Sequence, residues 1–389
     1  MGHMRSFFVA FCVFVLATSC KSEEIPTSPL AGKDALTASE TVEYTSFLTR
    51  QWKDSVKVAL QSSFDGKVLT HDALKMKMDW KTFGTAPAEG RALYISLHGG
   101  GATDAATNDG QWQNQLVLYT PSEGIYLCPR AIVNDWNMHF RKECDSFYED
   151  VIRMAVVFLD VNPDKVYLMG YSAGGDGVWQ LGPRMADHWA AASMMAGHPN
   201  GVSLVNLRNL PFSIWCGALD DSYNRNEACA AKIDELAALH AADPEGYVYE
   251  GHIVEGKPHW MDGVDRAAVP WMAQYKRNPY PKKVVWAQAD EKKPAFYWLG
   301  IPISQASKGK KIEARIDGNT VEILSCDYTT ATIYLSDKMM DLDKPVRVVF
   351  GERVLFEGNV TRSPAVMRQT LRERGDLSYI FPVRIDVKL

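Results

Sequence analysis

The chain has 389 residues, of which 46% are hydrophobic and 23% charged, a balance typical of a soluble chain that buries a core. Its formal net charge of −5 argues against general nucleic-acid binding, which depends on a basic surface. The length favours two or three domains.

The N-terminus reads as a secretory signal peptide over residues 1–19, with Gly2-His3 ahead of it resembling a cloning remnant. Arg5, the short apolar run "FFVAFCVFVLA" and the small residues before Cys20 are the parts of such a signal, and the run is too short to span a membrane comfortably. The ending "LATSC" resembles a bacterial lipobox and predicts lipidation of Cys20. The alternative is an ordinary signal peptide with a chance cysteine.

Residues 20–39 then read as a polar tether between the lipid and the folded part. We expect an exported protein anchored by lipid at the cell envelope, on the periplasmic or the surface-exposed side. Glu23 and Glu24 permit surface export.

Beyond Cys20 five cysteines remain, an odd number without a CxxC pair, so a zinc or redox motif is not expected. One or two disulfides are expected in an exported chain, with no pairing given by the sequence.

Apolar runs alternate with helical patterns from residue 40 to about residue 283, which predicts a mostly parallel sheet with helices on both faces. The expected helices cover 40–62, 146–159 and 226–243, and the expected strands cover 74–84, 92–101, 124–131, 165–170, 190–199, 211–221 and 246–256.

Residues 284–389 read as a small β-rich domain that follows a Pro- and Lys-rich joint. Alternating segments flank Asp317-Gly318-Asn319 and Gly351-Glu352, and each pair predicts a hairpin. One short helix is expected between Ser363, a suitable N-cap, and Gly375, a suitable stop.

Gly170-Tyr171-Ser172-Ala173-Gly174 matches the G-x-S-x-G nucleophile elbow, and it lies between a predicted strand and a predicted helix, as that motif requires. The turn is so sharp that residues beside the serine must lack bulk. Ser172 is therefore the expected nucleophile.

A serine hydroxyl needs a base and an orienting acid, which follow the nucleophile in this architecture in the order acid, histidine. Asp220, after the strand "SIWCGAL", is the favoured acid, and Asp221 is the alternative. His259, in the loop "VEGKPHWMDG" after the last strand of the set, is the expected base.

The segment "LHGGG" at residues 97–101 resembles the element that supplies an oxyanion-hole N–H beside that of the residue after the nucleophile. We assign the N–H groups of Ala173 and Gly100, with Gly99 or Gly101 as substitutes. His98 is expected to bond backbone rather than to act in catalysis.

These motifs, with "LCPRAIVNDWN", "GALDDSYNRNEA", "GKPHWMDG" and "YLSDKMMDLDKPVRV", resemble bacterial α/β-hydrolases of the poly(3-hydroxybutyrate) depolymerase-like group, close to esterase D and the feruloyl and acetyl-xylan esterases. The resemblance covers most of residues 90–389. It implies an α/β-hydrolase domain at 40–283 and a serine esterase with Ser172, Asp220 and His259 as its triad. The resemblance gives little information about the substrate.

The short connection after His198 leaves no room for a lid, so we expect an open cleft and an ester displayed on a larger molecule such as a polysaccharide. Tyr171, Arg130, Trp136 and Trp260 are the residues expected to line it. No metal or cofactor is expected.

Two other functions compete with the esterase. One is a serine peptidase of the prolyl-oligopeptidase type, weakened because no propeller precedes the catalytic part. The other is a non-catalytic carbohydrate-binding lipoprotein on a hydrolase scaffold.

Overall fold

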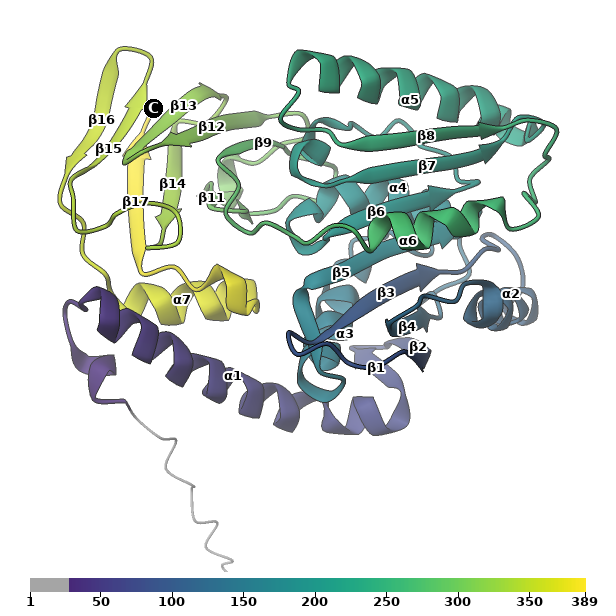
Figure 1. Cartoon of the computed structure of the whole chain (residues 1–389), viewed down its shortest axis with the longest axis horizontal. Helices are drawn as coiled ribbons and strands as arrows, with labels where there is room; N and C mark the ends of the chain where they lie inside the picture. The colour runs from purple at the N-terminus through teal and green to yellow at the C-terminus, as the bar shows by residue number, and fades with distance from the viewer. Residues whose placement is uncertain (1–27) are drawn as a thin grey trace, which may run out of the picture.

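A computed structural model describes residues 28–389. The predicted signal peptide and the predicted lipidation site, Cys20, lie outside the described residues. Figure 1 shows a large α/β body beside a smaller β-rich body, with the long helix α1 (Ala38–Gly66) running along both.

The α/β body is built on an eight-stranded sheet in the order β1-β2-β4-β3-β5-β6-β7-β8. β2 pairs antiparallel with β1 and β4, and all the other pairs are parallel. The strands are β1 (Val68–His71), β2 (Leu74–Phe83), β3 (Arg91–Leu97), β4 (Gly124–Pro129), β5 (Val161–Tyr171), β6 (Ala191–Met195), β7 (Phe212–Gly217) and β8 (Tyr249–Val254). The predicted α/β fold is confirmed.

Helices cover both faces of this sheet because side chains alternate along each strand. Leu93 and Ile95 on β3 share one apolar cluster with side chains from α3, α4 and α5, whereas Tyr94 joins a second cluster with α2 and α6. The helices are α2 (Ala105–Leu118), α3 (Cys144–Phe158), α4 (Ala173–Arg184), α5 (Arg225–Ala242) and α6 (Ala268–Met272). None of the helices within residues 28–389 is both long and apolar enough to cross a bilayer.

Three of these elements were not expected from the sequence: β1, α2 and α6. The apolar face of α2 is weak, since only Asn108, Gln115 and Leu116 are buried along it. Asp104 nevertheless caps it, accepting a hydrogen bond from the Thr107 N–H.

The C-terminal body holds a four-stranded sheet, β10-β11-β14-β17, and a five-stranded sheet, β16-β15-β13-β12-β9. Both predicted hairpins form, as β12–β13 and β15–β16, and α7 (Pro364–Arg374) begins after Ser363 and ends at Gly375. The strands are β9 (Lys283–Ala287), β10 (Ala295–Phe296), β11 (Leu299–Gly300), β12 (Lys311–Asp317), β13 (Thr320–Cys326), β14 (Thr330–Leu335), β15 (Val346–Phe350), β16 (Arg353–Gly358) and β17 (Val383–Lys388).

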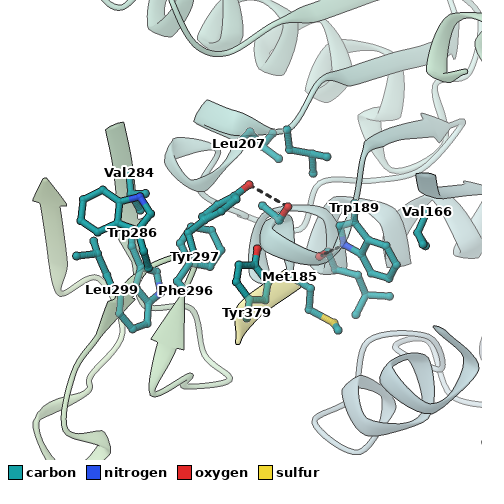
Figure 2. Packing of buried hydrophobic residues seen from close by; sticks show 14 of the residues in the cluster. Val166, Met185, Trp189, Leu207, Val284, Trp286, Phe296, Tyr297, Leu299 and Tyr379 are labelled. Atoms are coloured by element: carbon teal, nitrogen blue, oxygen red, sulfur yellow. Dashed lines mark hydrogen bonds between the residues drawn. The ribbon is translucent and has the colours of Figure 1, made fainter. Parts of the chain in front are cut away.

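The two bodies share one hydrophobic core. Figure 2 shows Tyr297 reaching from the C-terminal body to the segment after α4, where its hydroxyl donates to the Ala186 carbonyl at 3.1 Å. Trp189 and Trp286 belong to the same buried cluster. No water-filled layer therefore separates the bodies at this contact.

The predicted tether over residues 20–39 is wrong for its second half. Leu30 and Leu36 are buried in a cluster with Met367 and Leu371 of α7, and Leu36 bridges to Arg362. Burying leucines on a neighbouring helix favours a docked segment over a free one.

The expected disulfides are absent from the described residues, where Cys128, Cys144, Cys216, Cys229 and Cys326 are all free thiols. A hydrogen bond to Cys216, together with burial, raises the pKa of the Cys229 thiol. The Cys229 thiol therefore keeps its proton at neutral pH.

Candidate active site

The turn from β5 to α4 lifts Ser172 above the sheet. Its backbone has φ 58° and ψ −122°, a strained conformation that persists only where the surroundings enforce it. A side chain at Gly170 would meet the Gly174 carbonyl oxygen at 2.4 Å, and one at Gly174 would meet the Leu97 carbonyl oxygen at 2.1 Å. Both glycines of the motif are thus sterically required.

Ser172, His259 and Asp220 come together from three separate strand ends. His259 Nε2 lies 3.0 Å from Ser172 Oγ, and His259 Nδ1 lies 2.8 Å from Asp220 Oδ2. Asp220 is buried, whereas the His259 side chain is 43% exposed. When Nδ1 carries the proton and donates to the carboxylate, Nε2 is left free to accept the serine proton.

The loop after β3 packs against the elbow. A side chain at Gly99 would meet Ser172 Cβ at 3.4 Å, so this glycine permits the close approach. Among the described residues, the N–H groups of Gly100 and Ala173 have no hydrogen-bond partner. The two N–H groups that the sequence assigned to an oxyanion hole are therefore free to donate to a ligand.

Gly101 is not available as a substitute donor, because its N–H donates to Asn108 Oδ1 at 3.0 Å. Asn108 Nδ2 in turn donates to the Gly101 carbonyl at 3.0 Å. Gly100 has φ 109°, and a side chain there would meet Asn108 Oδ1 at 2.0 Å. The loop thus keeps its shape through a buried asparagine on α2 that sequence reasoning missed.

His98 bonds backbone, as expected. Its Nδ1 lies 2.6 Å from the Gly99 carbonyl, to which it donates, and its Nε2 accepts from the Ala131 N–H at 3.1 Å. Burial holds the pKa of His98 well below its usual value, and burial also lowers that of neighbouring His139 to about 4. Both rings are neutral parts of the scaffold.

The structure separates the four residues expected to line the cleft. Trp136 and Trp260 are open to solvent, with 57% and 45% of their surfaces exposed. Arg130 and Tyr171 are buried. Only the two tryptophans can offer a ring face to a ligand at the surface.

The Arg130 guanidinium is fully engaged within the protein, so its assignment to the pocket is wrong. It donates to Asp109 at 2.8 Å, to the Ala131 carbonyl at 2.8 Å and to Asn134. Asn134 also accepts from Asn108 at 3.1 Å, which links this arginine to the oxyanion loop.

Tyr171 holds the loop that carries His259 through two hydrogen bonds. Its hydroxyl donates to the His259 carbonyl at 2.7 Å and accepts from the Met261 N–H at 3.1 Å. Burial raises the pKa of Tyr171, so the hydroxyl keeps its proton. The hydroxyl is occupied and is not free to bind substrate.

Asp176 of α4 fixes the loop after β6 and does not face the triad histidine. Its carboxylate accepts from the His198 N–H at 2.7 Å, and burial raises the pKa of that carboxyl. Trp179 is buried in the core and donates to the Gly197 carbonyl at 3.2 Å.

A cleft of about 660 Å³ begins at Ala102, one residue past the oxyanion loop. Trp136 and Asn200 line it, and so do Asp290 and Glu291 from the loop between β9 and β10. The C-terminal body therefore contributes to this cleft, whose lining residues do not include Ser172, Asp220 or His259. That contribution could not be read from the sequence, because it depends on how the bodies pack.

The strand order and the elbow define an α/β-hydrolase fold. No protein-family model and no curated protein sequence matches the chain. Among solved structures, it is similar to a thermostable esterase (17% identity, TM-score 0.42, 54% of this chain and 62% of that one). It is also similar to Est1E from Butyrivibrio proteoclasticus with ferulic acid bound (13%, 0.35, 53% and 96%) and to the serine hydrolase FphF from Staphylococcus aureus (14%, 0.39, 53% and 96%). Similarities at this level add nothing to the fold class, which follows from the topology.

Proposed function

We propose that this protein is a serine hydrolase that cleaves carboxylic esters through an acyl-enzyme. The observation that carries the proposal is the unbroken chain from Ser172 Oγ through the His259 ring to Asp220, at 3.0 and 2.8 Å. The unpartnered N–H groups of Ala173 and Gly100 beside it support the same chemistry.

In the first half-reaction Ser172 Oγ attacks the ester carbonyl while His259 Nε2 takes its proton. The carbonyl oxygen becomes the oxyanion, which accepts from the Ala173 and Gly100 N–H groups. The imidazolium then protonates the leaving alcohol. A water molecule repeats the sequence on the acyl-enzyme and releases the carboxylic acid.

The direct test is hydrolysis of p-nitrophenyl acetate by the wild type and by Ser172→Ala. We expect the variant to lose about 10⁴-fold or more in kcat. Hydrolysis of aminoacyl amides and binding of glycans are measured alongside to separate the alternatives. Turnover of amides alone would favour the peptidase, and glycan binding without any turnover would favour the non-catalytic alternative.

For the natural substrate we propose an ester carried on a polysaccharide. Support comes from the exposed Trp136, which presents an aromatic face in a cleft lined largely by polar side chains. The half-exposed His259 also favours an open site that admits a long chain.

This substrate is tested by comparing Trp136→Ala with the wild type on acetylated xylan and on p-nitrophenyl acetate. We expect kcat/KM to fall about tenfold or more on the polymer and to stay within about twofold on the small ester. An equal loss on both substrates, or none on the polymer, would contradict the proposal.

We further propose export and lipid anchoring through Cys20, on the sequence pattern alone. Mass analysis of the membrane fraction should find a lipidated N-terminal cysteine. In Cys20→Ser the protein should leave that fraction. An unmodified mature N-terminus at another position would refute the anchor.

A further inference from the structure

Arg225 shares the triad carboxylate with the histidine. Asp220 Oδ2 accepts from His259, and the other oxygen, Oδ1, accepts from Arg225 Nη1 at 2.5 Å. The same Nη1 lies only 3.1 Å from His259 Nδ1. One guanidinium nitrogen therefore faces both the acid and the base.

These contacts set up a competition for His259 Nδ1. When Nδ1 carries the proton it donates to Asp220 and leaves Nε2 free as a base. When Nε2 carries the proton, Nδ1 can instead accept from Arg225, and the base function is lost. The shorter contact, 2.8 Å against 3.1 Å, is the one to the carboxylate.

The position of Arg225 is an unfavourable one for a cation. It is the first residue of α5, and the N-terminus of a helix carries partial positive charge. The residue is buried, and its Nε has no partner among the described residues. Among the described residues, Asp220 is the carboxylate in ion-pair contact with it, and Asp176 interacts with it electrostatically. The Tyr223 ring lies 5.7 Å from its guanidinium carbon. Neither the helix nor a wider ion network explains the charge.

We propose that Arg225 is a positioning residue that fixes Asp220 and offsets part of its negative charge at His259. This inference rests on the proposed function. In protonated His259 the ring would face the Asp220 carboxylate and the Arg225 cation together, so the charged form of the base is less favoured than with the carboxylate alone. Loss of the Arg225 cation is therefore expected to move the acidic limb of the rate profile to higher pH.

Other ionisable groups near His259 come from four elements. Cys216 precedes Asp220 at the end of β7, Cys229 lies on α5 and Tyr171 ends β5, and all three are buried. Asp176 on α4 accepts from the His198 N–H, and the Arg225 charge acts on it electrostatically. Lys257 pairs with Asp262 on the histidine's own loop, where buried Asp265 accepts from Tyr119. Arg225 is the only cation of this set in contact with the ring.

The test is the pH dependence of kcat/KM for p-nitrophenyl acetate in Arg225→Met, Arg225→Lys and the wild type, read at a wavelength where both forms of nitrophenol absorb equally. Arg353→Met, an exposed site on β16, is the matched control. We expect the acidic limb to move about one pH unit to higher pH in Arg225→Met. In Arg225→Lys, which keeps the charge, it should stay within about 0.3 unit.

An acidic limb in Arg225→Met that is unmoved, or that moves to lower pH, would overturn the inference, whatever the loss of rate. A merely structural arginine would lower kcat without shifting the limb. If Arg225→Met does not fold, Arg225→Gln is measured instead. If neither variant folds while Arg225→Lys is active, the arginine serves the stability of the fold and the inference is overturned. Activity of Ser172→Ala equal to the wild type would instead refute the proposed function.

Discussion

Asp220 and Asp221 are neighbours in sequence with opposite surroundings. Asp220 is buried and joined to both His259 and Arg225. Asp221 is exposed and stands at the start of a short 3-10 turn, where its side chain makes no capping hydrogen bond. The sequence alone left both open as the triad acid, and the geometry supports Asp220.

We predict that Asp220→Asn lowers kcat on p-nitrophenyl acetate by about 10⁴-fold, because the amide favours the wrong histidine tautomer. Asp221→Asn should keep activity within about twofold, as expected for a surface substitution. The reverse pattern would show that the acid is Asp221.

Tyr171 connects the nucleophile to the base. It precedes Ser172, its hydroxyl bonds to the His259 loop, and its ring lies 5.9 Å from the His259 ring. Tyr171→Phe removes those bonds and leaves two buried backbone groups unpaired, at a cost of about 1–3 kcal/mol in stability. We expect kcat to fall about tenfold, because the ring of His259 loses its support. Steady-state kinetics and urea unfolding of the variant measure both effects.

Helix α2 and the loop at residues 98–101 act as one element. Asn108 bonds both backbone groups of Gly101. It also donates to Asn134, which accepts from Arg130. The position of the Gly100 N–H therefore depends on a side chain that touches neither nucleophile nor base.

We predict that Asn108→Ala lowers kcat by about 10- to 100-fold, since loss of one oxyanion donor costs on the order of 10² to 10³. KM for a small ester should change little. Asn114→Ala, at an exposed site on the same helix, is the control and should match the wild type. Equal kcat values in Asn108→Ala and Asn114→Ala would show that Asn108 does not position the Gly100 N–H.

The elements that the sequence predicted well are those with strong local patterns. The buried parallel strands, the two hairpins and α7 with its Ser363 and Gly375 ends follow from apolar runs and turn residues. The elbow was visible because two glycines must flank Ser172. Asn108 and Arg225 were missed, because their roles depend on contacts made only when distant segments pack.

On the scale of the whole molecule, a buried ion network joins the two bodies. Arg374 of α7 pairs with Asp187 after α4, and Arg277 pairs with Asp164 and Asp376. Burial alone would raise the pKa of Asp187, but His188 and Arg374 hold it well below its usual value. Among the three carboxylates of this network, Asp187 and Asp376 have a lowered pKa.

A carboxyl whose pKa is lower in the folded protein stabilises the fold above its unfolded pKa of about 4, and this stability is lost as the pH falls through the folded value. We therefore expect the free energy of unfolding to stay nearly level from about pH 7 to 5 and to drop below about pH 4. In Asp187→Asn the drop should be smaller and the stability at pH 7 lower.

Urea unfolding between pH 7 and 3 measures this dependence, with Asp34→Asn at an exposed position as the control. An acid dependence as steep in Asp187→Asn as in the control would contradict the role of this carboxylate at the joint.

The apolar cluster that runs through both bodies has a consequence for engineering. A chain cut before β9 would bare the surface against which Trp286, Phe296 and Tyr297 now pack, and the excised C-terminal piece would bare those rings. Neither half should be soluble by itself, and grafting the β-rich part onto another hydrolase would require transplanting the segment around Ala186 and Trp189 with it. The β-rich part is thus not an independent module that could be exchanged between hydrolases.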